Sequence, residues 1–132
     1  MKDMPSTFPP QFLKIARETP CGSERAWQHP VVLDVVAVLA TEGNVILGGD
    51  VMHDEAGNLS YYSWFDGAYL YCGSWHIDFK PDEQSWAEYV AESAAVTVRY
   101  IEAYVQRNGG SFWYVLVFAD EERYVALEAH KM

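Results

Sequence analysis

The 132-residue chain has only two cysteines, Cys21 and Cys72, which excludes a disulfide framework. A chain of this length buries roughly two thirds of its unfolded surface and needs no disulfide or metal to fold. No apolar run reaches about 18 residues, which argues against a transmembrane helix. The N-terminus also lacks the cationic patch and apolar stretch of a signal peptide. We therefore expect a single domain over residues 1–132, in the reducing cytoplasm.

Basic side chains are scarce. The chain has 9 lysines and arginines against 19 aspartates and glutamates, giving a net charge of −10. Residues 34–92 account for the imbalance, with eleven acidic side chains and a single basic one, Lys80. This argues strongly against nucleic-acid binding, which requires cations to neutralise phosphates, and it disfavours anionic membranes. A concentrated acidic surface favours a basic protein partner with fast, salt-sensitive association, although it also serves solubility alone.

Local patterns predict both helices and strands. Half of the residues are apolar and 15% are aromatic, which is too much for a disordered chain. Pro5, Pro9 and Pro10 predict an extended lead-in over residues 1–10. The predicted helices cover residues 11–18, 30–42 and 86–107. The predicted strands cover residues 45–51, 59–64, 68–75, 112–119 and 124–128, the last of them at an edge of the sheet.

The predicted helix over residues 86–107 is the best marked. Ser85 is followed by Glu88 three positions later, which forms a capping box. Apolar residues then recur every three to four positions, and Asn108-Gly109-Gly110 ends the helix. The strands occur as local hairpins rather than βαβ units. We therefore predict an α+β fold, with a mostly antiparallel sheet on which the long helix packs and with helices near the N-terminus.

Signals for enzymatic chemistry are weak. No cysteine or histidine spacing fits a metal site, and no cofactor motif is present. The acidic surroundings would raise the pKa of the Cys72 thiol and weaken it as a nucleophile. An alternative function is that of a small hydrolase that uses Asp50, His53 and Asp66, or of a small-ligand or carbohydrate-binding module.

Aromatic residues are dense among acids. Residues 61–79 contain eight large rings, and three short strands cannot bury all of them on one face of a small sheet. Exposed tyrosine and tryptophan among carboxylates are typical of a surface that binds a protein rich in lysine or arginine. Three rings are the predicted anchors: Trp64, Tyr69 and Trp75. The acids predicted to steer and bind the partner are Asp50, Asp54, Glu55, Asp66, Asp78, Asp82 and Glu83.

A succession of short motifs resembles a known family. The motifs are Gly48-Gly49-Asp50-Val51, Ser63-Trp64 with Tyr71-Cys72, Ser85-Trp86-Ala87-Glu88-Tyr89 and Tyr114-Val115-Leu116-Val117. Over about residues 30–120 their order resembles the Immunity protein 40 family of bacterial polymorphic toxin systems. The resemblance implies a cytoplasmic, non-enzymatic protein without cofactor that binds and neutralises a cognate toxin. The acidic surface would suit a basic toxin. Self-association through the aromatic strands is an alternative, so we expect a monomer or a homodimer.

Overall fold

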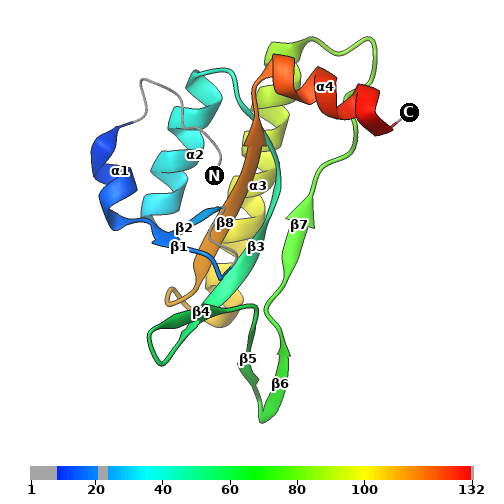
Figure 1. Ribbon diagram of the computed structural model, residues 1–132. Helices are drawn as coiled ribbons and strands as arrows, with labels where there is room; N and C mark the ends of the chain where they lie inside the picture. Colours follow the sequence, from blue (N-terminus) through cyan, green and yellow to red (C-terminus); the bar gives the residue numbers. More distant parts are fainter. Residues whose placement is uncertain (1–8, 21–23, 132) are drawn as a thin grey trace.

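The computed structural model describes residues 9–20 and 24–131, and Figure 1 shows a twisted sheet with two helices behind it. The helices are α1 (Pro10–Ile15), α2 (Val31–Thr41), α3 (Trp86–Asn108) and α4 (Glu121–Lys131). The strands are β1 (Arg17–Glu18), β2 (Arg25–Gln28), β3 (Val45–Glu55), β4 (Asn58–Ser60), β5 (Tyr62–Phe65), β6 (Ala68–Tyr71), β7 (Ser74–His76) and β8 (Trp113–Ala119). The predicted α+β class is confirmed.

The main sheet is antiparallel and is built around β3 and β8. Its order is β1-β2-β8-β3, and β3 is long enough to pair with two short strands in succession. Residues 48–50 of β3 pair with β7, and residues 53–55 pair with β4. The β5–β6 hairpin forms a separate two-stranded sheet beyond this end of β3. The strand predicted at residues 112–119 is β8, which occupies a central and buried position between β2 and β3.

The core lies between the sheet and the helices α2 and α3. Val32, Val35, Val36 and Leu39 of α2 recur at helical spacing and are all buried. Burial of each such side chain stabilises the fold by about 1.5–3 kcal/mol. This apolar face confirms the predicted helix at residues 30–42, although β-branched residues alone would also suit a strand.

The capping box of α3 is present as predicted. The Glu88 backbone N–H donates to Ser85 Oγ, and the Ser85 backbone N–H donates to Glu88 Oε1. This second bond lowers the pKa of Glu88. Farther along, Ser93 is completely buried, and its Oγ accepts a hydrogen bond from the Ile46 backbone N–H at 2.9 Å. The small Ser93 side chain therefore lets the helix approach the sheet closely.

The two glycines of β3, Gly48 and Gly49, mark a close approach between neighbouring strands. The register shifts between Ile46 and Gly48, where φ of Gly48 is +155°. A Cβ atom at Gly49 would lie 1.9 Å from the Val115 carbonyl oxygen and 2.5 Å from Cη2 of Trp75. Gly49 therefore leaves room for both neighbouring strands.

Residues 124–128 form part of α4, so the predicted edge strand is wrong. Asp120 precedes the helix and accepts a hydrogen bond from the Arg123 backbone N–H on Oδ1 at 2.9 Å, which is an N-terminal cap. Tyr124 is buried against Tyr89, with ring centroids 5.4 Å apart, and so fixes the helix on the body. The cap and this ring contact together outweigh the strand preference of Tyr124 and Val125.

Other boundaries also differ from the predictions, and the strand predicted at residues 45–51 continues to Glu55. The helix predicted at residues 11–18 ends at Ile15, because Ala16 is extended and β1 follows. The strand predicted at 59–64 divides into β4 and β5, and the strand predicted at 68–75 divides at Gly73 into β6 and β7. Most of the predicted lead-in over residues 1–10 lies outside the described residues. Among the residues that are described, no helix has the length and apolar character to cross a bilayer.

Candidate partner-binding surface

The β5–β6 hairpin is closed by a two-residue turn, Asp66-Gly67. Both turn residues have positive φ, +50° and +84°, which is the type I′ geometry that suits the twist of a hairpin. The turn pairs Trp64 with Tyr69 and Tyr62 with Tyr71. Residues at these alternate positions share one face of the hairpin. We call this set the aromatic hairpin face: Tyr62, Trp64, Tyr69 and Tyr71.

The aromatic hairpin face is exposed and internally packed. Trp64 is 66% exposed, and the three tyrosines are 45–46% exposed. The Trp64 and Tyr69 rings lie 5.1 Å apart, and the Tyr62 ring lies 5.7 Å from Tyr69 and 5.8 Å from Tyr71. Contiguous exposed aromatic surface of this kind marks sites of interaction on soluble proteins.

The opposite face of the hairpin attaches it to the body. Ser63 is buried, and Phe65 stacks on Phe112, the rings lying 6.0 Å apart and nearly parallel. At the base of the hairpin, the Cys72 backbone N–H donates to the Tyr61 carbonyl oxygen at 2.7 Å. The hairpin that carries the exposed rings is therefore fixed to the body of the protein.

Two carboxylates lie against the aromatic hairpin face. The Tyr69 hydroxyl donates to Glu55 Oε2 at 2.8 Å, and the Tyr71 hydroxyl donates to Asp50 Oδ1 at 3.0 Å. Burial raises the pKa of Tyr71, and the hydrogen bond to Asp50 raises it further, so the phenol stays protonated. Asp66 is exposed in the turn at the tip of the hairpin. The structure thus brings five of the predicted residues to this hairpin: Asp50, Glu55, Trp64, Asp66 and Tyr69.

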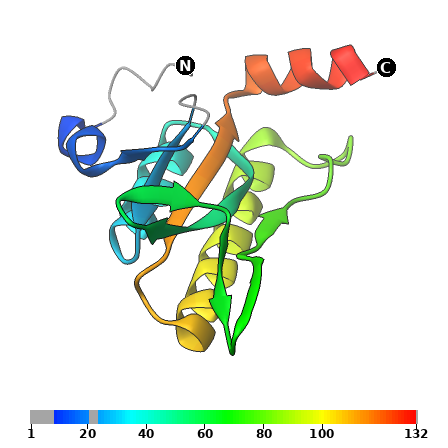
Figure 2. The ribbon, with the colours of Figure 1, turned by 60° about the horizontal axis from the view of Figure 1, so that its bottom comes forward.

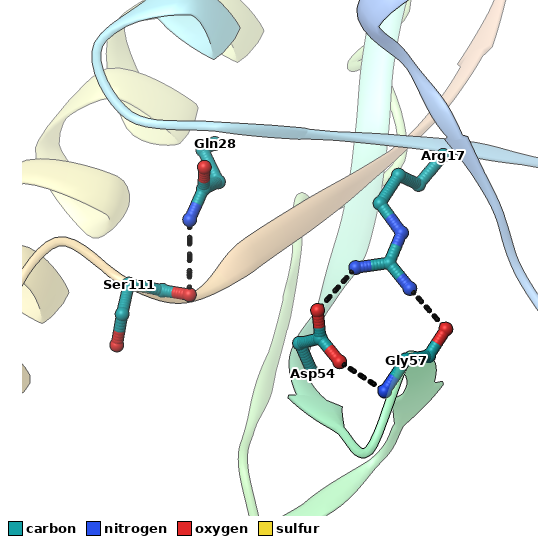
Figure 3. Close-up of polar contacts among 5 residues, drawn as sticks. All are labelled: Arg17, Gln28, Asp54, Gly57 and Ser111. Carbon is teal, nitrogen blue, oxygen red and sulfur yellow. Dashed lines mark hydrogen bonds and ion pairs between the residues drawn. The ribbon is translucent and has the colours of Figure 1, made fainter.

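Asp54 has an intramolecular role. Its Oδ2 lies 2.7 Å from Nη1 of Arg17, whose Nη2 donates to the Gly57 carbonyl oxygen, and the Gly57 N–H donates to Asp54 Oδ1 (Figure 3). The hydrogen bond from Arg17 is the main cause that lowers the pKa of Asp54. Arg17 thereby ties β1 to the β3–β4 turn and neutralises this carboxylate.

Trp75 lies in the core, and we leave it out of the binding surface. Only 7% of its surface is exposed, because β7 pairs with β3 and places the indole over Gly49. Its Nε1–H donates to Oγ1 of Thr97 on α3 at 3.1 Å.

Three other predicted acids lie away from the hairpin. Asp78, Asp82 and Glu83 belong to the segment between β7 and α3, which is at the opposite end of the molecule from β5 and β6 (Figure 1). This segment borders a pocket of about 530 Å³ whose lining includes Leu47, Phe79 and Leu127. The predicted acidic residues therefore do not form one continuous site.

The family model for Immunity protein 40 matches residues 15–118 of the chain. The chain belongs to the Immunity protein 40 family. The match spans the main sheet, α2, α3 and the aromatic hairpin face, and it ends before α4. Neither the curated proteins nor the solved structures gave a match. Membership indicates an immunity protein with a cognate toxin as its partner and a non-enzymatic role.

The three residues of the alternative hydrolase hypothesis do not come together in this immunity protein. Asp50 and His53 are three positions apart on β3, and this odd separation points their side chains to opposite faces. Asp66 is at the hairpin tip. Burial raises the pKa of the Cys72 thiol to about 11, so it is a poor nucleophile. Among the side chains that the structure describes, in residues 9–20 and 24–129, no three His, Cys, Asp or Glu come together as metal ligands.

Sequence reasoning did not assign Tyr62 and Tyr71 to the predicted site. The signal was available, because a two-residue Asp66-Gly67 turn fixes the register and sets Tyr62 opposite Tyr71. A single strand over residues 68–75, as predicted from the sequence, would place Trp75 on the same face as Tyr69. The break at Gly73, where φ is +134°, separates the two rings.

Proposed function

We propose that this immunity protein binds and neutralises its cognate toxin through the aromatic hairpin face together with Asp50, Glu55 and Asp66. One observation carries the proposal: four mutually packed, exposed rings stand on an anchored hairpin and are bordered by carboxylates. Tyrosine and tryptophan offer large contact areas at little cost in side-chain entropy, and they are enriched among the residues that dominate binding energies.

The charge of the surface favours a basic toxin. The chain carries a net charge of −10, with eleven acids and one lysine over residues 34–92, the segment that includes the hairpin. Lysine and arginine of a partner would meet ring faces and carboxylates at the same place, which combines cation–π and ionic attraction. A negative field over the surface also accelerates encounter with a basic partner.

Hydrogen bonds of the tyrosine hydroxyls fix the positions of the Tyr69 and Tyr71 rings in the unbound protein. Tyr69 is fixed by Glu55 and Tyr71 by Asp50. Rings that are already held lose less freedom on binding, which leaves more of the contact energy as affinity. We place the interaction in the cytoplasm, where the buried free thiol of Cys72 stays reduced.

Affinity capture from the source bacterium tests this function. The tagged full chain is used at low and at high salt, next to a variant with Trp64→Ala and Tyr69→Ala. We expect a stoichiometric partner of high isoelectric point that high salt weakens and that the double variant loses. The partner should arrest growth when it is expressed alone, and co-expression of the wild-type chain should relieve the arrest.

Leu127→Ala is the matched control, since Leu127 is 48% exposed on α4, outside the hairpin. This variant should capture and protect as well as the wild type. A captured partner that is harmless when expressed alone would contradict the neutralising role. Equal capture by the double variant would contradict the assignment of the surface.

A further inference from the structure

The outer edge of β6 is open. Among the described residues, β6 pairs only with β5, and all four of its residues are exposed. In Figure 1 and Figure 2 no strand lies beyond it. The outer side of β5 differs, because there the Tyr62 backbone N–H donates to Oγ of Ser60 at 3.1 Å. The hairpin therefore has one open edge.

The hairpin register identifies the backbone groups on this edge. In a two-residue hairpin, the residues that flank the turn exchange both hydrogen bonds, and every second pair does the same. Phe65 with Ala68 and Ser63 with Leu70 are these bonded pairs. The N–H and C=O groups of Tyr69 and Tyr71 therefore point away from β5, toward the open edge.

In the part of the chain that the structure describes, this edge is short but has no lysine, proline, bulge or covering segment. Natural edges are blocked by lysine, by proline, by a bulge or by a covering segment. β6 reads Ala-Tyr-Leu-Tyr, its register with β5 is regular, and Leu70 is 51% exposed. An extended segment of another chain has free access to it.

We infer that β6 receives an extended segment of the toxin as a third strand of the β5–β6 sheet, which rests on the function proposed above. The added strand would bond to the outward groups of Tyr69 and Tyr71. Residues of that strand directly opposite these tyrosines project on the same side as the rings. There they lie beside the rings of Tyr69 and Tyr71, whose faces attract cations.

This geometry specifies the sequence of the added segment. Lysine or arginine suits the two positions opposite Tyr69 and Tyr71, since the ring faces attract cations and residues 34–92 of this chain are strongly acidic. The position between them lies beside exposed Leu70 and suits valine, isoleucine or leucine. The segment is therefore basic–apolar–basic. A second copy of this chain fits poorly, because its β6 would bring the same rings and acids, with a net charge of −10, against this edge.

Amide hydrogen exchange tests strand addition directly. The probe is an acetylated and amidated heptapeptide, Thr-Thr-Lys-Val-Lys-Thr-Thr, added at millimolar concentration to the full ¹⁵N-labelled chain. We expect exchange of the Tyr69 and Tyr71 amides to slow by at least about tenfold, with the inward amides of Ala68 and Leu70 unchanged. A peptide with glutamate in place of both lysines is the control and should leave all four amides unchanged.

A pair of substitutions makes the test specific to the edge. Leu70→Lys adds a cation at the edge and should abolish the effect of the peptide, whereas Leu127→Ala, on α4 and outside the hairpin, should retain it. If the exchange rates of the Tyr69 and Tyr71 amides do not change on adding the peptide, the inference is overturned. This holds both when the peptide does not bind and when it shifts only the NMR signals of the rings. Protection of the two amides that grows with protein concentration alone would overturn it in favour of self-association. The assay contains no toxin, so its failure leaves the capture experiment to decide the proposed function separately.

Discussion

Trp75 covers Gly49 on the adjacent strand and reaches past it to hydrogen-bond Thr97 on α3, with Nε1 and Oγ1 3.1 Å apart. The contact joins β7, β3 and the long helix. This contact explains why a tryptophan from an aromatic, acidic segment is a core residue.

Gly49→Ala should destabilise the protein strongly. The added methyl group would lie 1.9 Å from the Val115 carbonyl oxygen and 2.5 Å from the Trp75 ring, and the backbone oxygen cannot rotate away. Overpacking of a core costs about 1–3 kcal/mol and at times more. We expect a loss of at least about 3 kcal/mol in the free energy of unfolding, measured by urea denaturation.

Gly110→Ala is the matched control, because nothing lies within 4 Å of the Cβ position at Gly110. Its free energy of unfolding should stay within about 0.5 kcal/mol of the wild type. Equal stability of the two variants would show that β3 and β7 do not approach as described.

The Cys72 thiol should be unreactive in the folded protein. Burial raises its pKa from 9.0 to about 11, so at pH 8 the thiolate fraction falls about 100-fold. The measurement uses Ellman's reagent on a Cys21→Ser background, so that only one thiol is counted. We expect at least about 100-fold slower reaction than for a free cysteine and rapid reaction in urea. Fast reaction without denaturant would refute the burial of this thiol.

The Arg17–Asp54 pair should make stability depend on pH in the acidic range. Arg17 lowers the pKa of Asp54 below its ordinary value of 3.8. A carboxyl whose pKa is lowered in the folded state adds stability above its unfolded pKa, and this stability is lost as pH falls through the folded pKa. Asp54→Asn should therefore be less stable than the wild type at pH 6, and the difference should vanish in strong acid.

Urea denaturation at a series of pH values checks this expectation, and NMR titration of the Asp54 carboxyl carbon gives its pKa directly. Arg17→Met should raise that pKa toward 3.8. A pKa unchanged by Arg17→Met would show that the guanidinium does not control it.

Acids and rings at the hairpin should affect different rate constants of toxin binding. Glu55→Gln should slow association by a few-fold at low salt, because it weakens the steering field. Trp64→Ala should mainly speed dissociation, because it removes an exposed anchor. Surface-plasmon kinetics against the captured toxin measure both, with Asp78→Asn as a control far from the hairpin. An equal effect of Asp78→Asn would move the binding surface toward the opposite end of the molecule.

Short-range signals in the sequence determined much of this protein. The capping box of Ser85 and Glu88 set the start of α3, and the Asp66-Gly67 turn set the hairpin, because both depend on residues a few positions apart. The order of the short motifs indicated the Immunity protein 40 family. The concentration of acids over residues 34–92 is likewise a property of the sequence alone.

The tertiary structure alone decided which of the predicted residues meet. β3 runs through the sheet and pairs with β7 and then β4, so acids close in sequence are drawn to different surroundings. Asp54 is neutralised by Arg17, 37 positions away, and Trp75 is buried by pairing with β3 and by contact with α3. Burial and charge pairing depend on long-range contacts, and no local pattern encodes those contacts.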